Sequence, residues 1–467
     1  MDVERLGAVL KRLAGFEWLV SCDRLSAGAS RETYRLQVVM NGAERTLALR
    51  RAEGDGQSAM GSGPGLNVEA QLFAAARGAG VPGPEVLLVL QPEDQLGAGF
   101  VMEWIAGETL GGRIARAPEF VETRKTLARE CGEILARLHS VDVKAAGLDV
   151  VLEAFTPEHI VRKTHAAYLE LHSPQPMIDF VAMWLLANLP KQHAMKLVHS
   201  DFRNGNLIVD PKQGVVAVLD WELAHVGDPM RDLGWVVTRS WRFGVPEKDV
   251  GGFGDRDDLI AGYEAASGEK VDRDAVRFWE VFGSFWWAVG CMSMGMSFRV
   301  GMETSLERPA IGRRSSECQI DCVNLLIPGP VAAATAATDS LSATDLPRSD
   351  ELLVGVRDFL RGDAAQALSG RNQFLARVAA NSIDMIMREI ALGTEARAFE
   401  MVALRGLVGD GHDLPTLREN LCQAIRFGEI DLHSADLHAY LRQSVYAQVM
   451  IDQPGYAGAV EAGKRLT

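Results

Sequence analysis

The sequence predicts an α+β chain with a β-rich lobe, a mainly helical lobe and a small all-α domain. Three observations predict it: alternating strand patterns near the N-terminus, helical spacing further on, and a late segment that lacks large apolar residues. With 467 residues the chain is too long for one compact core. We expect a first lobe over 1–105, a second over 106–328, a linker over 329–349 and a helical domain over 350–467.

The strands of the first lobe are indicated by alternation and by turn signals. Residues 34–39 alternate in polarity, Asn41-Gly42 favours a hairpin turn, and residues 47–50 resume an extended pattern. A helix is expected over 68–77 and a further strand over 99–105. The boundary between the lobes therefore lies near residue 105.

Helical patterns dominate the rest of the chain. Residues 124–139 are predicted to form a helix, and the aromatic run over 278–287 is typical of a helix in a core. Segment 329–349 consists mainly of Ala, Thr, Ser and Pro, which cannot build a core. Apolar residues recur at helical spacing after it. The composition predicts that few contacts cross this linker and that the two sides fold independently.

Composition narrows the function classes. A hydrophobic fraction of 47% and a charged fraction of 24% are ordinary for a folded chain. The net charge of −14 opposes binding to nucleic acids and to anionic membranes, so a small-molecule partner is favoured. The N-terminus lacks the pattern of an export signal, and the apolar run 285–296 falls short of the ~20 residues that cross a bilayer. These features predict a cytoplasmic protein without a membrane partner.

The most informative segment contains two apolar runs, 207–209 and 215–219, separated by the turn signal 210–214. We expect them to form a hairpin. Asn206 precedes the first run and Asp220 follows the second, so antiparallel pairing returns both side chains to the same end.

Asp201 lies five residues before Asn206, in the loop that enters that end of the hairpin. Magnesium prefers hard oxygen ligands, and a hydroxyl nucleophile needs a proton acceptor, so this cluster suits phosphoryl transfer. Asp and Asn also favour turns and helix caps for local reasons. That alternative suffices for any one of these residues, whereas the three together in this order favour a phosphoryl-transfer site.

The segment resembles the aminoglycoside phosphotransferase and choline kinase family, whose members share the two-lobed fold of protein kinases. That family has a His-Gly-Asp loop, an Asn five residues after the Asp, and a hairpin leading to an Asp that precedes Trp or Phe. The matching residues are His199, Asp201, Asn206 and Asp220. The motifs Asp-Phe-Arg and Leu-Asp-Trp-Glu-Leu also resemble those of kinase-like domains fused to some acyl-CoA dehydrogenases. This resemblance covers about residues 20–325. The last domain resembles an uncharacterised helical family found after such kinases.

The resemblance implies a Mg²⁺-dependent kinase that uses ATP, with GTP left open, and phosphorylates an alcohol group. His199 would brace the loop, Asp201 would be the catalytic base, and Asn206 and Asp220 would hold magnesium. Asp232 would support the loop. Ser200 stands where the family has Gly, and an unusual backbone angle there would add strain.

The resemblance also places a nucleotide site in the first lobe. A turn of small residues over 25–30 lies where the family covers the phosphates, and Arg50 stands where kinases usually have Lys, with Arg51 as a neighbouring rival. Glu69, in the helix that follows, stands where the ion-pair partner of Arg50 is expected. Residues 102–105 would contact adenine through backbone groups. The residues expected at the nucleotide are Gly28, Ser30, Arg50, Glu69, Glu103 and Ile105.

Arg203 lies two residues after the expected base and favours an anionic or neutral hydroxylated acceptor, such as a hydroxy acid or its acyl thioester. The alternative is that Arg203 pairs with Asp228 or another local acid and never meets the acceptor. Trp279 and Glu280 fall where related enzymes build part of the acceptor site, although core packing is also consistent with them.

Two other functions compete with a small-molecule kinase. A nucleotide-binding pseudokinase would use the fold as a scaffold that acts with its C-terminal helical domain. A protein kinase is disfavoured because Asp220 is followed by Trp221 and Glu222 rather than Phe-Gly.

Overall fold

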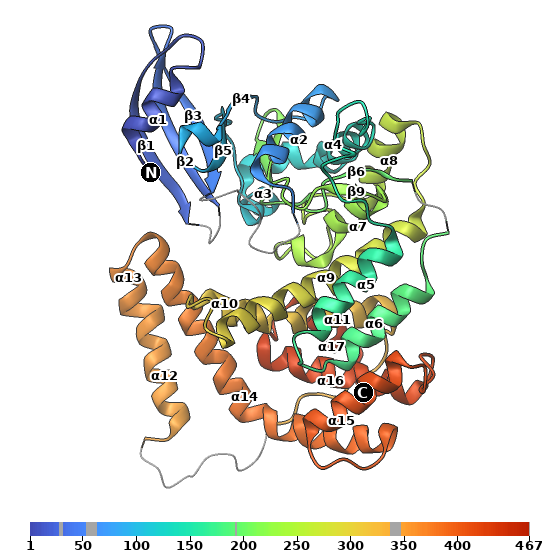
Figure 1. Cartoon of the computed structure of the whole chain (residues 1–467). Helices are drawn as coiled ribbons and strands as arrows, with labels where there is room; N and C mark the ends of the chain where they lie inside the picture. The colour runs from blue at the N-terminus through green and yellow to red at the C-terminus, as the bar shows by residue number, and fades with distance from the viewer. Residues whose placement is uncertain (28–30, 53–62, 192–193, 337–346, 467) are drawn as a thin grey trace. The chain divides into compact units, whose positions relative to one another are not determined.

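The computed structural model describes residues 1–27, 31–52, 63–191, 194–336 and 347–466 (Figure 1). The chain divides into two compact units. The first contains Met1–Pro157 and Pro190–Glu280, and the second contains Glu158–Leu189 and Val281–Thr467.

An antiparallel five-stranded sheet begins the first unit, in the order β1-β2-β3-β5-β4. Asn41 and Gly42 turn the chain between β2 and β3 with φ of 53° and 77°, the left-handed conformation that a tight hairpin requires. Strands β2, β3 and β5 and this hairpin agree with the sequence prediction, which gave no strand at 86–89. The strands are β1 (Phe16–Ala27), β2 (Glu32–Met40), β3 (Ala43–Ala52), β4 (Val86–Val89) and β5 (Ala98–Glu103).

The two faces of the sheet are covered by different elements because side chains alternate along each strand. Helix α1 (Val3–Leu10) buries Leu6 and Leu10 against a cluster that includes Leu36 of β2. On the other face, α2 (Leu66–Gly78) places Phe73 against Phe100 of β5 at a ring distance of 5.8 Å. Phe73 and Phe100 belong to a second hydrophobic cluster, which continues into the helical part of this unit.

Close helix packing anchors the helical part of the first unit. Helices α4 and α8 approach each other at Gly132, where an added Cβ would lie 2.0 Å from the carbonyl oxygen of Leu259. Only glycine allows this approach without a backbone shift. The elements here are α3 (Gly111–Arg116), α4 (Val121–His139), β6 (Lys196–Val198), β7 (Leu207–Asp210), β8 (Gly214–Val218), β9 (His225–Gly227), α7 (Met230–Val237) and α8 (Arg256–Ser267), with short 3₁₀ turns at Pro92–Asp94, Pro118–Phe120 and Arg239–Trp241.

The second unit is helical. It includes most of α9, whose Phe278, Phe282 and Phe285 are buried as the sequence predicts for a core helix. Its elements are α5 (Pro157–Leu169), α6 (Pro176–Ala187), α9 (Arg273–Arg299), α10 (Glu307–Arg313), α11 (Ser315–Leu326), α12 (Ser349–Phe359), a π turn (Leu360–Ala364), α13 (Ala365–Ala367), α14 (Gly370–Val408), α15 (Leu414–Arg426), α16 (Ala435–Asp452) and α17 (Ala457–Gly463).

Helices from both sides of segment 329–349 share a core in the second unit. Helix α11 precedes that segment and packs against α16 and α17, which follow it, while α6 packs against α15. Tyr456 donates a hydrogen bond to Asp321 of α11, and Arg465 donates one to Asn324. Among the described residues, no helix combines the length and apolar character needed to cross a bilayer.

Candidate active site

The predicted hairpin forms as β7 and β8 and brings the two expected magnesium ligands together. Leu207 pairs with Val218, and the backbone N–H of Leu219 donates a 2.8 Å hydrogen bond to the carbonyl of Asn206. This bond extends the ladder by one step, so Asp220 follows directly beside Asn206. Two hard oxygen donors therefore lie at the same end of the hairpin.

A buried carboxylate holds the loop that carries the expected base. Asp232, at the start of α7, accepts hydrogen bonds from the backbone N–H groups of His199 at 2.8 Å and Ser200 at 2.7 Å. His139 of α4 donates to it from Nε2 at 3.1 Å. Burial alone would raise the pKa of Asp232, but these hydrogen bonds hold the pKa below its usual value. The expected supporting role of Asp232 agrees with this geometry.

Ser200 adopts the left-handed conformation that its glycine counterpart would take more easily. Its φ is 67°, a conformation that costs a non-glycine residue about 1 kcal/mol. Its hydroxyl lies 3.0 Å from Nδ1 of His225, a contact that glycine cannot make. Ser200 thus adopts this conformation while its backbone N–H still donates to Asp232.

His199 braces the loop as a neutral imidazole. Its Nε2 donates to the carbonyl of Leu219 at 3.0 Å, and its Nδ1 accepts from the backbone N–H of Asp201 at 3.2 Å. Burial lowers the pKa of His199, which favours the neutral ring, and the two hydrogen bonds place its proton on Nε2. Through Leu219 and Asp201, the ring joins the hairpin to the base.

The carboxylate of Asp201 is buried and accepts three hydrogen bonds from side chains. Arg203 Nε donates to Oδ1 at 2.8 Å and Trp235 Nε1 donates to the same oxygen at 2.9 Å. Asn206 Nδ2 donates to Oδ2 at 2.6 Å. A carboxylate has about four acceptor positions, so one remains for a substrate hydroxyl. Burial raises the pKa of Asp201, and the charge of Arg203 partly opposes that rise.

Arg203 lies against both the base and an aromatic ring. Its guanidinium is 4.4 Å from the ring centre of Trp241, which itself packs against Trp235. The local acid that pairs with Arg203 is thus the expected base, Asp201. Asp228, the other acid considered for this pair, accepts a hydrogen bond from Trp279 Nε1 at 2.9 Å. Trp235 was missed by the sequence reasoning, because a tryptophan on an amphipathic helix carries no signal beyond packing.

A cluster of charged side chains connects the end of the β7–β8 hairpin with strand β3 and helix α2. Arg50 of β3 contacts Glu69 of α2 at 3.3 Å and Asp220 at 2.6 Å. Arg31 contacts Glu69 at 2.9 Å and Glu222 at 3.3 Å. Sequence reasoning paired Glu69 with Arg50 but missed Arg31, which immediately precedes β2 and belongs to no recognisable motif.

The pKa shifts in this cluster follow burial and pairing. Glu69 is fully buried, and this burial raises its pKa although two arginines oppose the rise. Burial would also raise the pKa of Asp220, but the charge and hydrogen bond of Arg50 hold it below its usual value. Asp220 is therefore a carboxylate at neutral pH.

Arg51, the rival of Arg50, points to the other side of the strand. It donates to Glu32 at 2.7 Å and to the carbonyl of Leu96 at 2.9 Å. Adjacent strand residues face opposite ways, so only Arg50 reaches Asp220.

The donor set fits a magnesium ion that also binds a nucleotide. Magnesium is usually held by one or two protein oxygen ligands together with substrate phosphates, and Asn206 and Asp220 supply such a pair. Within the described residues, no three His, Cys, Asp or Glu side chains are grouped as metal ligands.

The structure gives less information on the other four residues that the sequence predicts at the nucleotide. Gly28 and Ser30 lie outside the described residues. Glu103 ends β5, and its carboxylate accepts from the backbone N–H of Glu85 at 3.0 Å, while Ile105 follows in the connection between the lobes. One oxygen of the Glu103 carboxylate thus binds the backbone next to β4, which does not test the expected contact of this segment with a nucleotide.

Trp279 and Glu280 are core residues. Trp279 is 2% exposed and bonds to Asp228, and Glu280 is 4% exposed. Arg242 and Arg256 hold the carboxylate of Glu280 at 3.4 and 2.9 Å. Packing therefore accounts for both side chains, and an acceptor role for them is not supported.

The sequence matches a family model described as the phosphotransferase enzyme family over residues 21–279. A second model, a domain of unknown function (DUF6285), matches residues 366–456. A solved structure from Ralstonia eutropha, named for the aminoglycoside phosphotransferases, aligns with a TM-score of 0.58 and 25% identity. It covers 69% of this chain and 98% of that one.

Curated relatives with sequence similarity include larger proteins. Acyl-CoA dehydrogenase family member 10 of Mus musculus is 31% identical over 215 residues, covering 44% of this chain and 19% of the relative. Acyl-CoA dehydrogenase family member 11 of Gallus gallus is 30% identical over 223 residues, covering 46% and 27%. The matched segment is thus less than a third of either relative's length.

Proposed function

We propose that this chain, which belongs to the phosphotransferase enzyme family, transfers the γ-phosphate of ATP to a hydroxyl group of a small metabolite. The observation that carries the proposal is the convergence of Asp201, Asn206 and Asp220 at one end of the β7–β8 hairpin. The test below also includes GTP as an alternative phosphate donor.

Each residue has a distinct part in this proposal. Asp201 accepts the proton of the acceptor hydroxyl through the position that Arg203, Trp235 and Asn206 leave unused. Asn206 and Asp220 would hold Mg²⁺, which when bound neutralises charge on the phosphates. Arg50 supplies a positive charge beside Asp220.

The charge beside the base supports an acceptor that is anionic or neutral. A hydroxyl that reaches Asp201 also approaches Arg203, whose guanidinium can bind a carboxylate or phosphate with two parallel hydrogen bonds. The pairing of Arg203 with Asp201 leaves no unpaired carboxylate beside the base to attract a polycationic acceptor. We therefore propose a hydroxy acid, or its acyl thioester, as the acceptor class.

The test is acceptor-dependent release of ADP, measured with Mg-ATP and Mg-GTP. Matched alcohols would be compared, one set with a carboxylate, one neutral and one with an amine. We expect turnover with the carboxylate set, and in Arg203→Ala a KM that rises by about ten-fold for the carboxylates but not for the neutral alcohols.

Two outcomes would contradict the proposal at different levels. Efficient turnover of cationic alcohols with none of the hydroxy acids would reject the acceptor class and leave the kinase assignment standing. Nucleotide binding without turnover on any acceptor would instead favour the pseudokinase scaffold.

A further inference from the structure

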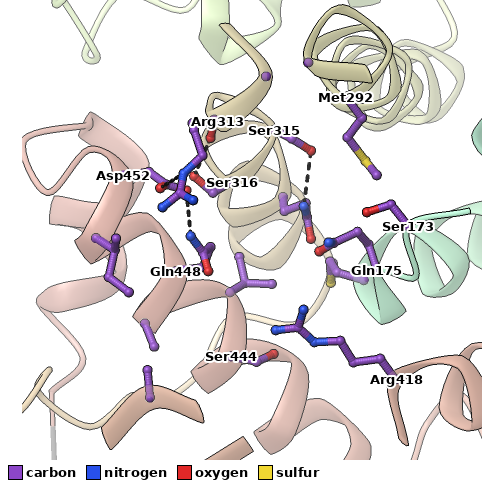
Figure 2. A pocket seen from close by; sticks show the side chains of 18 of the residues that line it. Ser173, Gln175, Met292, Arg313, Ser315, Ser316, Arg418, Ser444, Gln448 and Asp452 are labelled. Atoms are coloured by element: carbon purple, nitrogen blue, oxygen red, sulfur yellow. Dashed lines mark hydrogen bonds and ion pairs between the residues drawn. The ribbon is translucent and has the colours of Figure 1, made fainter. Parts of the chain in front are cut away.

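A pocket of about 610 Å³ opens within the second unit (Figure 2). All of its lining residues belong to that unit. Its volume lies in the ~300–1,000 Å³ range of small-molecule sites. Its walls come from the loop before α6, from the start of α6 and from α9, α10, α11, α14, α15 and α16, so the shape is set by packing between separate helices.

Arg313 is held in place at one side of this pocket by a buried carboxylate. Its Nε donates to Asp452 at 2.6 Å, and its Nη2 donates to Glu389 at 2.9 Å. Gln448 donates to the second oxygen of Asp452 at 3.0 Å, and the carboxylate is only 3% exposed (Figure 2). These bonds orient the guanidinium before any ligand arrives.

Arg418 is held in the same way at a second position. Its Nε and Nη2 donate to Glu400 at 2.7 and 2.6 Å, and the hydroxyl of Tyr440 donates to the same carboxylate at 3.0 Å. Figure 2 shows the guanidinium of Arg418 pointing into the pocket. Both arginines keep further N–H donors beyond those used by their carboxylates.

The charges that line the pocket do not balance. Three carboxylates, Glu389, Glu400 and Asp452, are all engaged by arginines. Four arginines line the pocket, so one positive charge is in excess, although the chain as a whole carries −14. Arg397 is 54% exposed and has only a 3.6 Å contact with Glu389. Arg299 is exposed and has no ion pair among the described residues.

Another part of the lining is apolar. It is made of Met177, Met292, Met296 and Phe298. Flexible thioether side chains adapt to apolar bodies of different shapes. The pocket thus combines an excess positive charge with an adaptable apolar surface.

We propose that this pocket binds a small organic anion with an apolar body, either a carboxylate or a phosphate monoester. A cation would find every lining carboxylate already paired, and a neutral ligand would leave the excess positive charge without a counter-ion. The site is separate from the phosphotransferase site, and the proposal does not depend on that activity.

The test is titration calorimetry on the full chain with octanoate, octyl phosphate, octanol and inorganic phosphate. Octanoate or octyl phosphate should bind, and whichever is tighter identifies the head group. Octanol and inorganic phosphate should each bind at least about ten-fold more weakly, because each lacks one half of the recognised chemistry.

Charge variants locate the interaction. Arg397→Gln and Arg299→Gln should each weaken binding of the anionic probe by about three- to ten-fold. Both side chains are exposed, so the fold should be retained. Arg377→Gln is the matched control, because Arg377 is exposed on the same helix as Arg397 but does not line the pocket. It should leave affinity unchanged.

Methionine methyl NMR gives an independent readout. The resonances of Met292 and Met296, assigned through Met→Leu variants, should shift on titration with the probe, and Asp201→Asn should bind it as the parent chain does. Equal affinity for octanol and octanoate would overturn the proposal. Unchanged affinity in both arginine variants, shifts only at methionines outside the pocket, or no binding of either anion would also overturn it.

Discussion

The two compact units bury charged side chains with opposite results. In the first, Asp201 accepts three hydrogen bonds and still keeps one acceptor position for a substrate. In the second, Glu400 and Asp452 are engaged by arginines and neighbouring polar groups, and their effect is to orient those arginines. The first arrangement leaves an anionic base available to a substrate. The second presents positive charge to a pocket.

This difference also explains why one region can be recognised from sequence and the other cannot. The groups around Asp201 come mostly from one loop and the hairpin that follows it, so their order along the chain forms a motif. The pocket residues come from helices spread from residue 171 to residue 452. No short pattern connects them.

The largest expected effect comes from deleting everything after residue 330. Helix α11 would lose α16 and α17, which cover buried residues including Ile320 and Val323. We expect the 1–330 fragment to lose solubility or cooperative unfolding, measured by sedimentation and calorimetry against the full chain.

A matched control is a protease site inserted after the exposed Thr335. Cleavage there should leave the two pieces associated. A soluble 1–330 fragment that unfolds cooperatively would instead support independent folding, as the linker composition predicts, and would show that α11 does not need the later helices.

The next effect is on catalysis. Asp201→Asn should lower kcat by roughly 10² to 10⁴, the range for losing a general base, while Mg-nucleotide affinity stays within about two-fold. Steady-state kinetics and calorimetry check the two parts.

Asp220→Ala provides the contrast, because it removes a metal ligand rather than a proton acceptor. It should weaken Mg-dependent nucleotide binding by at least about ten-fold. If Asp201→Asn kept the turnover of the parent chain, the base assignment would be wrong whatever Asp220→Ala does.

The smallest effect is on pH dependence. Asp201 must be deprotonated to act, and burial raises its pKa, so kcat/KM should fall as pH drops through a value above the ordinary ~3.9. Arg203 opposes that rise in the pKa of Asp201, so Arg203→Gln should move the acid limb further upward.

The control for this shift is Arg116→Gln, since Arg116 is exposed and bonds only within its own helix. An acid limb that stays in place or moves downward in Arg203→Gln would show that Arg203 does not set the protonation of the base.

The sequence alone determined strands β2, β3 and β5 of the first sheet, the β7–β8 hairpin and the position of Asn206 and Asp220 at one end of it. These features depend on alternation, turn residues and antiparallel pairing between neighbouring strands, which act over short stretches of chain. The loop position of Asp201 follows from the same local order.

Only the tertiary structure decided which arginine serves the charged cluster, since Arg50 and Arg51 are equivalent until the faces of β3 have partners. It also brought Trp235 to Asp201 and Arg31 to Glu69. Such contacts join segments far apart in the chain, and their geometry depends on how whole elements pack. That packing is set by the combined burial of many side chains, so no local pattern encodes it.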